Sequence, residues 1–232
     1  FFKKKIAVGY DGRLTSPTLK KALCCGLIDA GAEIYSIGLC PTPMSYFAHY
    51  HLETDAIIMV TGSHNPSEYN GFKMVLNKHS FFADKIQQLQ SLLDGNQLKI
   101  NKGKVIDVNI KNDYIKRNLQ NIKLNKKIKI AWDTANGAMG TVIKEFTKAL
   151  SNAEHIIINE EVDGNFPNHH PDPTVPKNMK QLIDCVLKNS CDLGLAFDGD
   201  GDRLGVIDNL GKIIWADQYM LLLAKEISTL YK

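Results

Sequence analysis

The sequence lacks any long hydrophobic run, and this removes membrane-embedded proteins from consideration. None of its apolar stretches approaches the roughly 18 residues that a membrane-spanning helix requires, and no signal-peptide core follows the first lysines. We therefore predict a protein that has no membrane partner.

Cysteine is scarce and follows no metal-binding or disulfide pattern. The 232 residues contain five cysteines, an odd number, and no Cys-x-x-Cys pair. A disulfide scaffold or a zinc ribbon needs paired cysteines at regular spacing, so both classes are excluded. We predict reduced, buried thiols in a cytoplasmic protein, at Cys24, Cys25, Cys40, Cys185 and Cys191.

A large excess of one charge is also lacking. The 28 basic and 25 acidic residues leave a net charge of +3, and the lysines are scattered apart from small basic spots at 3–5 and 126–127. No nucleic-acid partner is expected, because such proteins concentrate basic residues on one face. The composition is that of an ordinary globular protein, with 44% hydrophobic and 23% charged residues, and suffices for a buried core.

Strand and helix patterns alternate along the first half of the chain. Short apolar runs predict buried strands, and apolar residues at helical spacing predict the helices between them, the first of which Gly31 closes. The expected strands are 5–10, 34–39, 55–60 and 72–76, and the expected helices are 19–30, 44–52 and 84–93.

A polar segment at 95–112 predicts a linker, after which the same rhythm restarts. The expected helices are 112–122, 139–150, 179–187 and 217–231, and the expected strands are 128–132, 156–159, 193–197, 204–207 and 213–215. Alternation of this kind favours an α/β fold with two tandem, mostly parallel sheets covered by helices.

A polar loop, TGSHNP at 61–66, follows the buried strand at 55–60. Ligands gather at the carboxyl ends of strands in open α/β sheets. Ser63 would be exposed there with His64 beside it and Lys73 ten residues on, as a hydroxyl that attacks or carries phosphate requires. The alternative is that Ser63 and Asn65 only stabilise a turn.

A second polar loop, DGDGDR at 198–203, separates two apolar runs. Its three carboxylates at alternate positions can converge on one hard cation such as Mg²⁺, whereas without a positive charge they repel each other. The alternative is a solvated acidic turn. Arg203 would either bind phosphate or neutralise the cluster.

Two further segments favour structural roles. The loop FPNHHPDP at 166–173 holds His169 and His170, but adjacent side chains on an extended chain point apart, so we predict a structural loop. Asp133 and the Asn136-Gly137 pair are expected to form a strand-to-helix turn.

Together, TGSHNP with the following NGFK, DGDGDR and FPNHHPDP resemble the α-D-phosphohexomutase superfamily and, within it, the bacterial phosphomannomutase/phosphoglucomutase group. The resemblance runs from residue 4 to the end of the chain. It implies domain I with the phosphoserine loop at 1–100, domain II with the magnesium loop at 108–211, and the start of domain III at 212–232.

The resemblance implies a phosphoryl-transfer enzyme that interconverts hexose 1-phosphate and 6-phosphate, with mannose or glucose as the sugar. Ser63 would be the phosphoserine, and the reaction would pass through a hexose 1,6-bisphosphate, which also serves as activator. Asp198, Asp200 and Asp202 would hold Mg²⁺ together with a phosphate oxygen on Ser63.

The resemblance also assigns the charged residues of the site. Lys73 and Arg203 would bind the substrate and stabilise charge on the transferring phosphoryl group. Either Lys73 or His64 would be the general acid–base, and the sequence favours neither.

The departures from the family suggest a chain truncated before domains III and IV. It begins with Phe1 rather than Met, and the family's sugar-recognition loop and its Tyr-Asp-x-Arg-Gly stretch have no counterpart here. Gln218 stands where many relatives carry arginine. The missing C-terminal domains would be the natural packing partner. One alternative is a phosphoglucosamine mutase, against which the FPNHHPDP stretch argues. The other is a catalytically idle remnant or scaffold.

Overall fold

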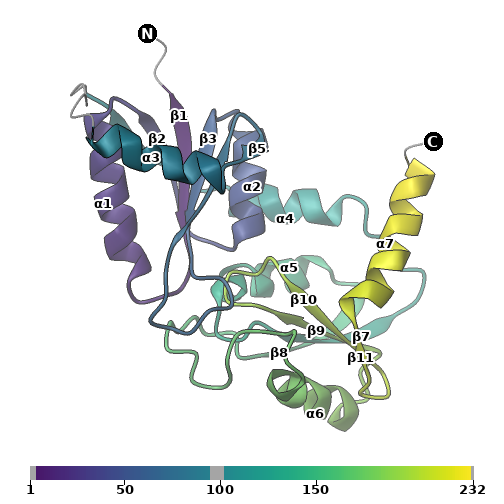
Figure 1. Cartoon of the computed structure of the whole chain (residues 1–232). Helices are drawn as coiled ribbons and strands as arrows, with labels where there is room; N and C mark the ends of the chain where they lie inside the picture. Colours follow the sequence, from purple (N-terminus) through teal and green to yellow (C-terminus); the bar gives the residue numbers. More distant parts are fainter. Residues whose placement is uncertain (1–3, 95–101, 231–232) are drawn as a thin grey trace.

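The computed structural model describes residues 4–94 and 102–230, which form two α/β units, each built on its own sheet (Figure 1). We call the unit around the first sheet the first layer and the unit around the second sheet the second layer. The first sheet has six strands in the order β5-β4-β3-β1-β2-β6. Its strands are β1 (Lys5–Tyr10), β2 (Glu33–Leu39), β3 (Ala56–Val60), β4 (Phe72–Leu76), β5 (His79–Ser80) and β6 (Lys104–Asp107). β1, β2, β3 and β6 are parallel, whereas β4 and β5 add an antiparallel edge.

Helices cover both faces of the first sheet because its central strands are apolar on both sides. α1 (Ser16–Asp29) places Cys24 against Val8 and Ile34 on one face. α2 (Thr42–His51) and the start of α4 (Lys111–Leu119) pack on the other face, where Met44 and Ile110 join the core.

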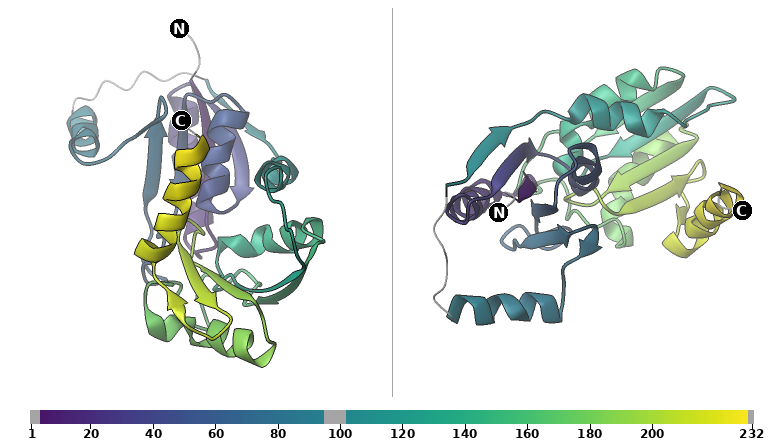
Figure 2. Two further views of the ribbon diagram at one scale, coloured as in Figure 1. Left: turned by 90° about the vertical axis from the view of Figure 1, so that its right-hand side faces the viewer. Right: turned by 90° about the horizontal axis from the view of Figure 1, so that it is seen from above.

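α3 (Asp84–Asp94) differs from these helices. The side chains described in it are exposed, and the helix stands apart from both sheets (Figure 2).

The second sheet has five strands in the order β11-β10-β9-β7-β8. They are β7 (Ile128–Asp133), β8 (Ala153–Ile158), β9 (Leu193–Phe197), β10 (Leu204–Asp208) and β11 (Ile213–Ile214). β8, β7 and β9 are parallel, and β10 and β11 extend the sheet with antiparallel pairings.

Helices again cover the two faces of the second sheet. α6 (Lys180–Lys188), preceded by the 3₁₀ turn η2 (Pro176–Met179), packs Leu182 and Val186 on one face. α5 (Ile143–Ala149), preceded by η1 (Ala138–Thr141), packs Ile143 against Trp132 on the other. α7 (Ala216–Leu230) leaves this sheet at the C-terminal end of the described chain (Figure 1).

The predicted fold class, two tandem helix-covered α/β sheets, is confirmed, but three local predictions were wrong. Residues 104–107, expected within a linker, form β6 and pair with β2. This run is only four residues long and lies at the sheet edge, so its pattern was too short to recognise. The helix expected at 139–150 is divided at Val142, and β8 begins at Ala153 rather than at 156. Residues 95–101 of the expected linker lie outside the described residues.

Among the helices of residues 4–94 and 102–230, none combines the length and the apolar character that crossing a bilayer would take.

The core of the second layer yields a packing prediction. A methyl group on Gly194 of β9 would lie 2.7 Å from Val186 Cγ2 and 3.1 Å from Ile207 Cβ, whereas one on Gly26 of α1 would meet nothing within 4 Å. We expect Gly194→Ala to lower the free energy of unfolding by about 1–3 kcal/mol through overpacking. We expect Gly26→Ala to raise it by about 0.5–1 kcal/mol through helix propensity. Urea unfolding followed by circular dichroism measures both, and equal effects would contradict the packing described here.

Candidate functional site

The site forms where strand ends from the two sheets meet. Asp11 follows β1, Thr42 follows β2 at the start of α2, and Thr61 follows β3. Asp198 directly follows β9 of the second sheet. The Thr42 backbone N–H donates to the carbonyl oxygen of Asp200 at 2.8 Å, so the two layers are joined by main-chain contact at this point.

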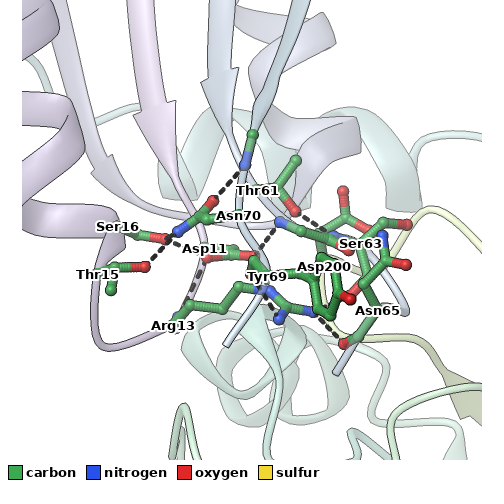
Figure 3. Close-up of polar contacts among 12 residues, drawn as sticks. Asp11, Arg13, Thr15, Ser16, Thr61, Ser63, Asn65, Tyr69, Asn70 and Asp200 are labelled. Carbon is green, nitrogen blue, oxygen red and sulfur yellow. Dashed lines mark hydrogen bonds and ion pairs between the residues drawn. The ribbon is translucent and has the colours of Figure 1, made fainter. Parts of the chain in front are cut away.

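The serine loop, residues 61–71, is a tight turn held by its own polar groups. Ser63 has the left-handed backbone conformation (φ 50°), and its N–H donates to Thr61 Oγ1 at 2.8 Å. Both the backbone N–H and the side-chain amide of Asn65 donate to the Gly62 carbonyl oxygen. Asn70 ties the end of the loop to Thr15 and Ser16 at the start of α1 (Figure 3).

The acidic loop, residues 198–203, wraps around the carboxylate of Asp198. Its Oδ1 accepts the backbone N–H groups of Asp202 and Arg203, both at 3.0 Å. Glycine is required at 199 because a Cβ there would lie 2.6 Å from the Ser63 carbonyl oxygen. The serine loop and the acidic loop are therefore in van der Waals contact through their backbones.

The side chains of the two loops meet as well. Ser63 Oγ donates to Asp198 Oδ2 at 3.0 Å, across 135 residues of sequence. Asp198, Asp200 and Asp202 each offer a carboxylate oxygen, and these oxygens all lie within 4.8 Å of one another. Asp198 and Asp200 are fully buried, whereas Asp202 is exposed.

Lys73 is the positive charge that approaches these carboxylates. The pairing of β4 with β3 sets Lys73 opposite Met59, near the carboxyl end of β3. Its Nζ donates to Asp200 Oδ2 at 2.7 Å and to Asp202 Oδ2 at 2.5 Å. Thr42 Oγ1 also donates to Asp200 Oδ2. Two residues of the first layer thus bind one carboxylate of the second.

Burial and mutual repulsion set the charge states of the cluster. Burial, reinforced by the charge of Asp200, raises the pKa of Asp198 to about 7. Burial also opposes ionisation of Asp200, but the Lys73 ammonium outweighs it and lowers the pKa of that carboxyl. The same carboxylates outweigh the effect of burial on Lys73 and raise its pKa, so Lys73 is held in its cationic form.

The oxygen atoms of the cluster fit a hard divalent cation. Carboxylates are the ligands that Mg²⁺ takes in proteins. Asp200 Oδ1 is buried and has no hydrogen-bond partner among the described residues, and such an atom is costly unless something positive binds it. The residues that could hold the ion are Asp198, Asp200 and Asp202, with an oxygen on Ser63 beside them.

The other two predicted site residues lie at the margin of the cluster. His64 Nδ1 is 3.4 Å from Ser63 Oγ, a distance at which a hydrogen bond is weak. Arg203 is exposed. Burial opposes ionisation of nearby Asp172, but hydrogen bonds from Thr174 outweigh it and lower the pKa of Asp172, and the Arg203 charge adds to this effect. The guanidinium of Arg203 is therefore free to face solvent or a ligand.

The loop at 166–173 makes the internal contacts expected of a structural loop. His169 Nε2 lies 2.9 Å from Asp133 Oδ2 and its Nδ1 lies 3.0 Å from the His170 carbonyl oxygen. The other oxygen of Asp133 accepts the Ala135 backbone N–H and the Asn159 amide. Asp133 thus stabilises the turn after β7 and also anchors the loop.

Sequence analysis missed three buried polar residues beside the site, namely Asp11, Arg13 and Thr42. A signal existed for the first two: a charged Asp-Gly-Arg run directly follows the apolar strand at 5–10. Nothing in the sequence pairs Thr42 with Asp200, 158 residues away.

Family comparisons match both layers. Residues 2–98 match the family described as "Phosphoglucomutase/phosphomannomutase, alpha/beta/alpha domain I", and residues 112–211 match its domain II. A solved structure of a phosphoglucomutase/phosphomannomutase family protein from Burkholderia thailandensis superposes with a TM-score of 0.91 at 38% identity. That match covers 97% of this chain and 51% of the other.

Curated relatives carry related names. A phosphomannomutase/phosphoglucomutase of Pseudomonas putida is 45% identical over 96% of this chain and 48% of its own length. A probable phosphoglucosamine mutase of Methanothermobacter thermautotrophicus is 32% identical over 96% of this chain and 50% of its own. The chain therefore spans about half the length of the curated relatives it matches.

The His169–Asp133 pair generates a pH prediction. Burial lowers the pKa of His169, but the hydrogen bond to Asp133 outweighs it, and the pKa lies above its ordinary value of 6.5. The protonated ring thus stabilises the folded state at low pH, and this stabilisation is lost as pH rises through the raised pKa. We expect the stability difference between the wild type and His169→Asn to shrink from about pH 5 to about pH 8.

Urea unfolding at a series of pH values measures that difference. His170→Asn is the matched control, because this neighbouring ring is exposed. The same pH dependence in both variants would contradict the pairing.

Proposed function

Because the chain belongs to the phosphoglucomutase/phosphomannomutase family, we propose that it carries the phosphoryl-transfer centre of a hexose phosphate mutase. One observation carries this proposal: Ser63 Oγ lies 3.0 Å from Asp198 Oδ2, at the edge of a cluster of three carboxylates. A hydroxyl next to a cation site is the arrangement needed to accept and return a phosphoryl group.

The first half-reaction loads Ser63 from a hexose 1,6-bisphosphate. Ser63 Oγ forms a bond to phosphorus, and the bond between that phosphorus and the sugar oxygen breaks. The sugar leaves with one phosphate and one free hydroxyl. In the return transfer, phosphorylated Ser63 gives its phosphate to the free hydroxyl of a hexose monophosphate, and the bond between phosphorus and Ser63 Oγ breaks. The bisphosphate so formed then turns around and gives its other phosphate to Ser63, so the phosphate has moved between the 1- and 6-positions and the substrate must bind in two orientations.

Two protons must move during loading, and the site has a group for each. Lys73 places an ammonium group beside the cluster, where its Nζ donates to Asp200 and Asp202, so it is the N–H donor nearest to a leaving sugar oxygen. His64, 3.4 Å from Ser63 Oγ, is the adjacent group that can accept the serine proton. Loading leaves His64 protonated and Lys73 neutral, which are the states that the return transfer requires.

The metal in this proposal is Mg²⁺, held by Asp198, Asp200 and Asp202 beside the Ser63 oxygen. When bound, it offsets negative charge on the transferring phosphoryl group. Lys73 approaches the same region from β4. Arg203, exposed at the end of the acidic loop, is suited to contact a phosphate of the substrate.

Mannose and glucose phosphates are the proposed substrates, because relatives named phosphomannomutase/phosphoglucomutase match at 45% identity. The phosphoglucosamine mutase alternative is supported by a relative of that name at 32% identity. The catalytically idle scaffold remains a rival, and phosphate uptake by Ser63 distinguishes it from an active centre.

Two further parts of the proposal concern the surroundings of the chain. α7 exposes several apolar side chains, which supports packing of this helix against a further part of the enzyme. That part would correspond to the half of the relatives' sequences that this chain does not match. The exposed side chains are Met220, Leu221, Leu222, Leu223 and Ile227. All five cysteines are free thiols, which supports a location in the reducing cytoplasm.

Ser63→Ala tests the nucleophile. We expect the wild-type chain incubated with Mg²⁺ and glucose 1,6-bisphosphate to gain one phosphate by intact-mass spectrometry, and Ser63→Ala to gain none, because the accepting oxygen is gone. Ser67→Ala is the matched control, since Ser67 is an exposed serine of the same loop and should leave uptake unchanged. Uptake by Ser63→Ala, or none by the wild type, would contradict the proposal.

Asp200→Asn tests the metal site. The change removes one charge from an oxygen set within 4.8 Å, so we expect Mg²⁺ affinity, measured by calorimetry, to fall at least about 10-fold. Asp208→Asn removes the same charge from the end of β10, outside the cluster, and should bind Mg²⁺ like the wild type. Equal affinities in the wild type and both variants would remove these carboxylates from the metal site.

A further inference from the structure

A buried arginine that the proposed chemistry does not use lies directly beneath the serine loop. The Arg13 side chain has no solvent exposure. Its two terminal nitrogens donate to four backbone carbonyl oxygens of the loop (Figure 3). These carbonyls belong to Ser63, Asn65, Pro66 and Tyr69, and the first two lie 2.7 Å from Nη2.

Arg13 has no donor left for a substrate. A guanidinium has five N–H groups. Nε donates to Asp11 Oδ2 at 3.2 Å, and Nη1 and Nη2 each donate to two carbonyl oxygens. Because every donor is satisfied inside the protein, Arg13 acts on the loop and not on a phosphate.

Asp11 fixes the guanidinium from the opposite side. It is 1% exposed, and its oxygens accept the Arg13 backbone N–H, the Ser16 hydroxyl and the Gly62 backbone N–H. One buried carboxylate thus anchors both the arginine and the first turn of the loop. Burying such a pair costs free energy, which the hydrogen bonds of both partners to the loop and to the start of α1 offset.

The geometry that this pair fixes is the backbone at Ser63. Ser63 has a left-handed conformation, which a non-glycine residue adopts only when its surroundings hold it there. Gly62 lies so close to the guanidinium that a Cβ would be 2.6 Å from Arg13 Cζ and 2.6 Å from the Tyr69 carbonyl oxygen. The loop therefore contacts the guanidinium from Gly62 to Tyr69.

The second layer touches the same arginine. The ring centre of Phe166 lies 5.2 Å from Arg13 Cζ, within the range of a cation–π contact. A Cβ on Gly164 would be 2.9 Å from Arg13 Cα and 2.7 Å from the Gly12 carbonyl oxygen. Arg13 is thus enclosed by the serine loop, Asp11 and the 164–166 segment of the second layer.

We propose that Arg13, fixed by Asp11, is a positioning residue that holds Ser63 in its left-handed conformation, with Oγ directed at the carboxylates of the acidic loop. This inference rests on the proposed function for the role of Ser63, but the hold on the loop backbone does not. A displacement of the reacting oxygen by about 1 Å would cost on the order of 100-fold in rate.

Arg13→Lys is the principal variant, because an ammonium keeps the charge opposite Asp11 but cannot satisfy four carbonyl oxygens with three N–H groups. A second variant, Asp11→Asn with Arg13→Gln, removes both buried charges together and guards against misfolding of the first. His49→Gln is the matched control. This histidine is buried in the same layer, and its hydrogen bond goes to Thr54 rather than to the loop.

Two measurements are made on each folded variant. Intact mass after incubation with Mg²⁺ and glucose 1,6-bisphosphate gives the rate of phosphate uptake and the bisphosphate concentration at half-maximal rate. Hydrogen–deuterium exchange gives the protection of amides in residues 61–71 and in the central strands.

We expect the Arg13 variants to lose about 100-fold in maximal uptake rate, with the half-maximal concentration unchanged. We also expect faster exchange confined to residues 61–71, whereas His49→Gln should keep the wild-type uptake rate. The inference would be overturned if both Arg13 variants took up phosphate at the wild-type rate, or if amide exchange in residues 61–71 were unchanged in both. If the wild type takes up no phosphate, the proposed function fails, and loop exchange alone decides whether Arg13 holds the loop.

Discussion

Three carboxylates crowd at the site, with oxygens within 4.8 Å of one another and two of the three side chains fully buried. Such a cluster is unfavourable unless positive charge or hydrogen-bond donors surround it. The donors come from both layers: Lys73, Thr42 and Ser63 from the first, and backbone N–H groups of the acidic loop from the second. The acidic loop therefore joins the two sheets at the place where the chemistry is proposed.

A second buried charge of opposite sign lies on the other side of the serine loop. The loop passes between the Arg13 guanidinium and the carboxylates, with its carbonyl oxygens on the arginine and its Ser63 hydroxyl on Asp198. Loops are usually the mobile part of an α/β protein, but this one is bound on both sides. Its geometry is set by charges buried in the core of the molecule rather than by its own turn residues alone.

Site residues can be predicted from the sequence where a local motif marks them, but not where their partners are distant in the sequence. TGSHNP and DGDGDR are local patterns, so Ser63 and the three aspartates could be selected as candidates before the fold was known. Its position ten residues after Ser63 marks Lys73 as a candidate, whereas its contacts with Asp200 and Asp202 span 127 and 129 residues and leave no local pattern. Arg13 was missed because four of its partners are backbone carbonyl oxygens, which no side-chain pattern marks.

The amino-acid order alone is enough to predict the alternation of strands and helices, the fold class and the residue types that carry charge, because these depend on hydrophobic periodicity and local spacing. It did not reveal the short edge strand β6, which is stabilised by pairing with β2. The pairs that meet at the site, such as Thr42 with Asp200 and Ser63 with Asp198, follow from the packing of the two layers. Buried charges and unpaired backbone groups take whichever partners the packed layers bring near, regardless of their separation along the chain.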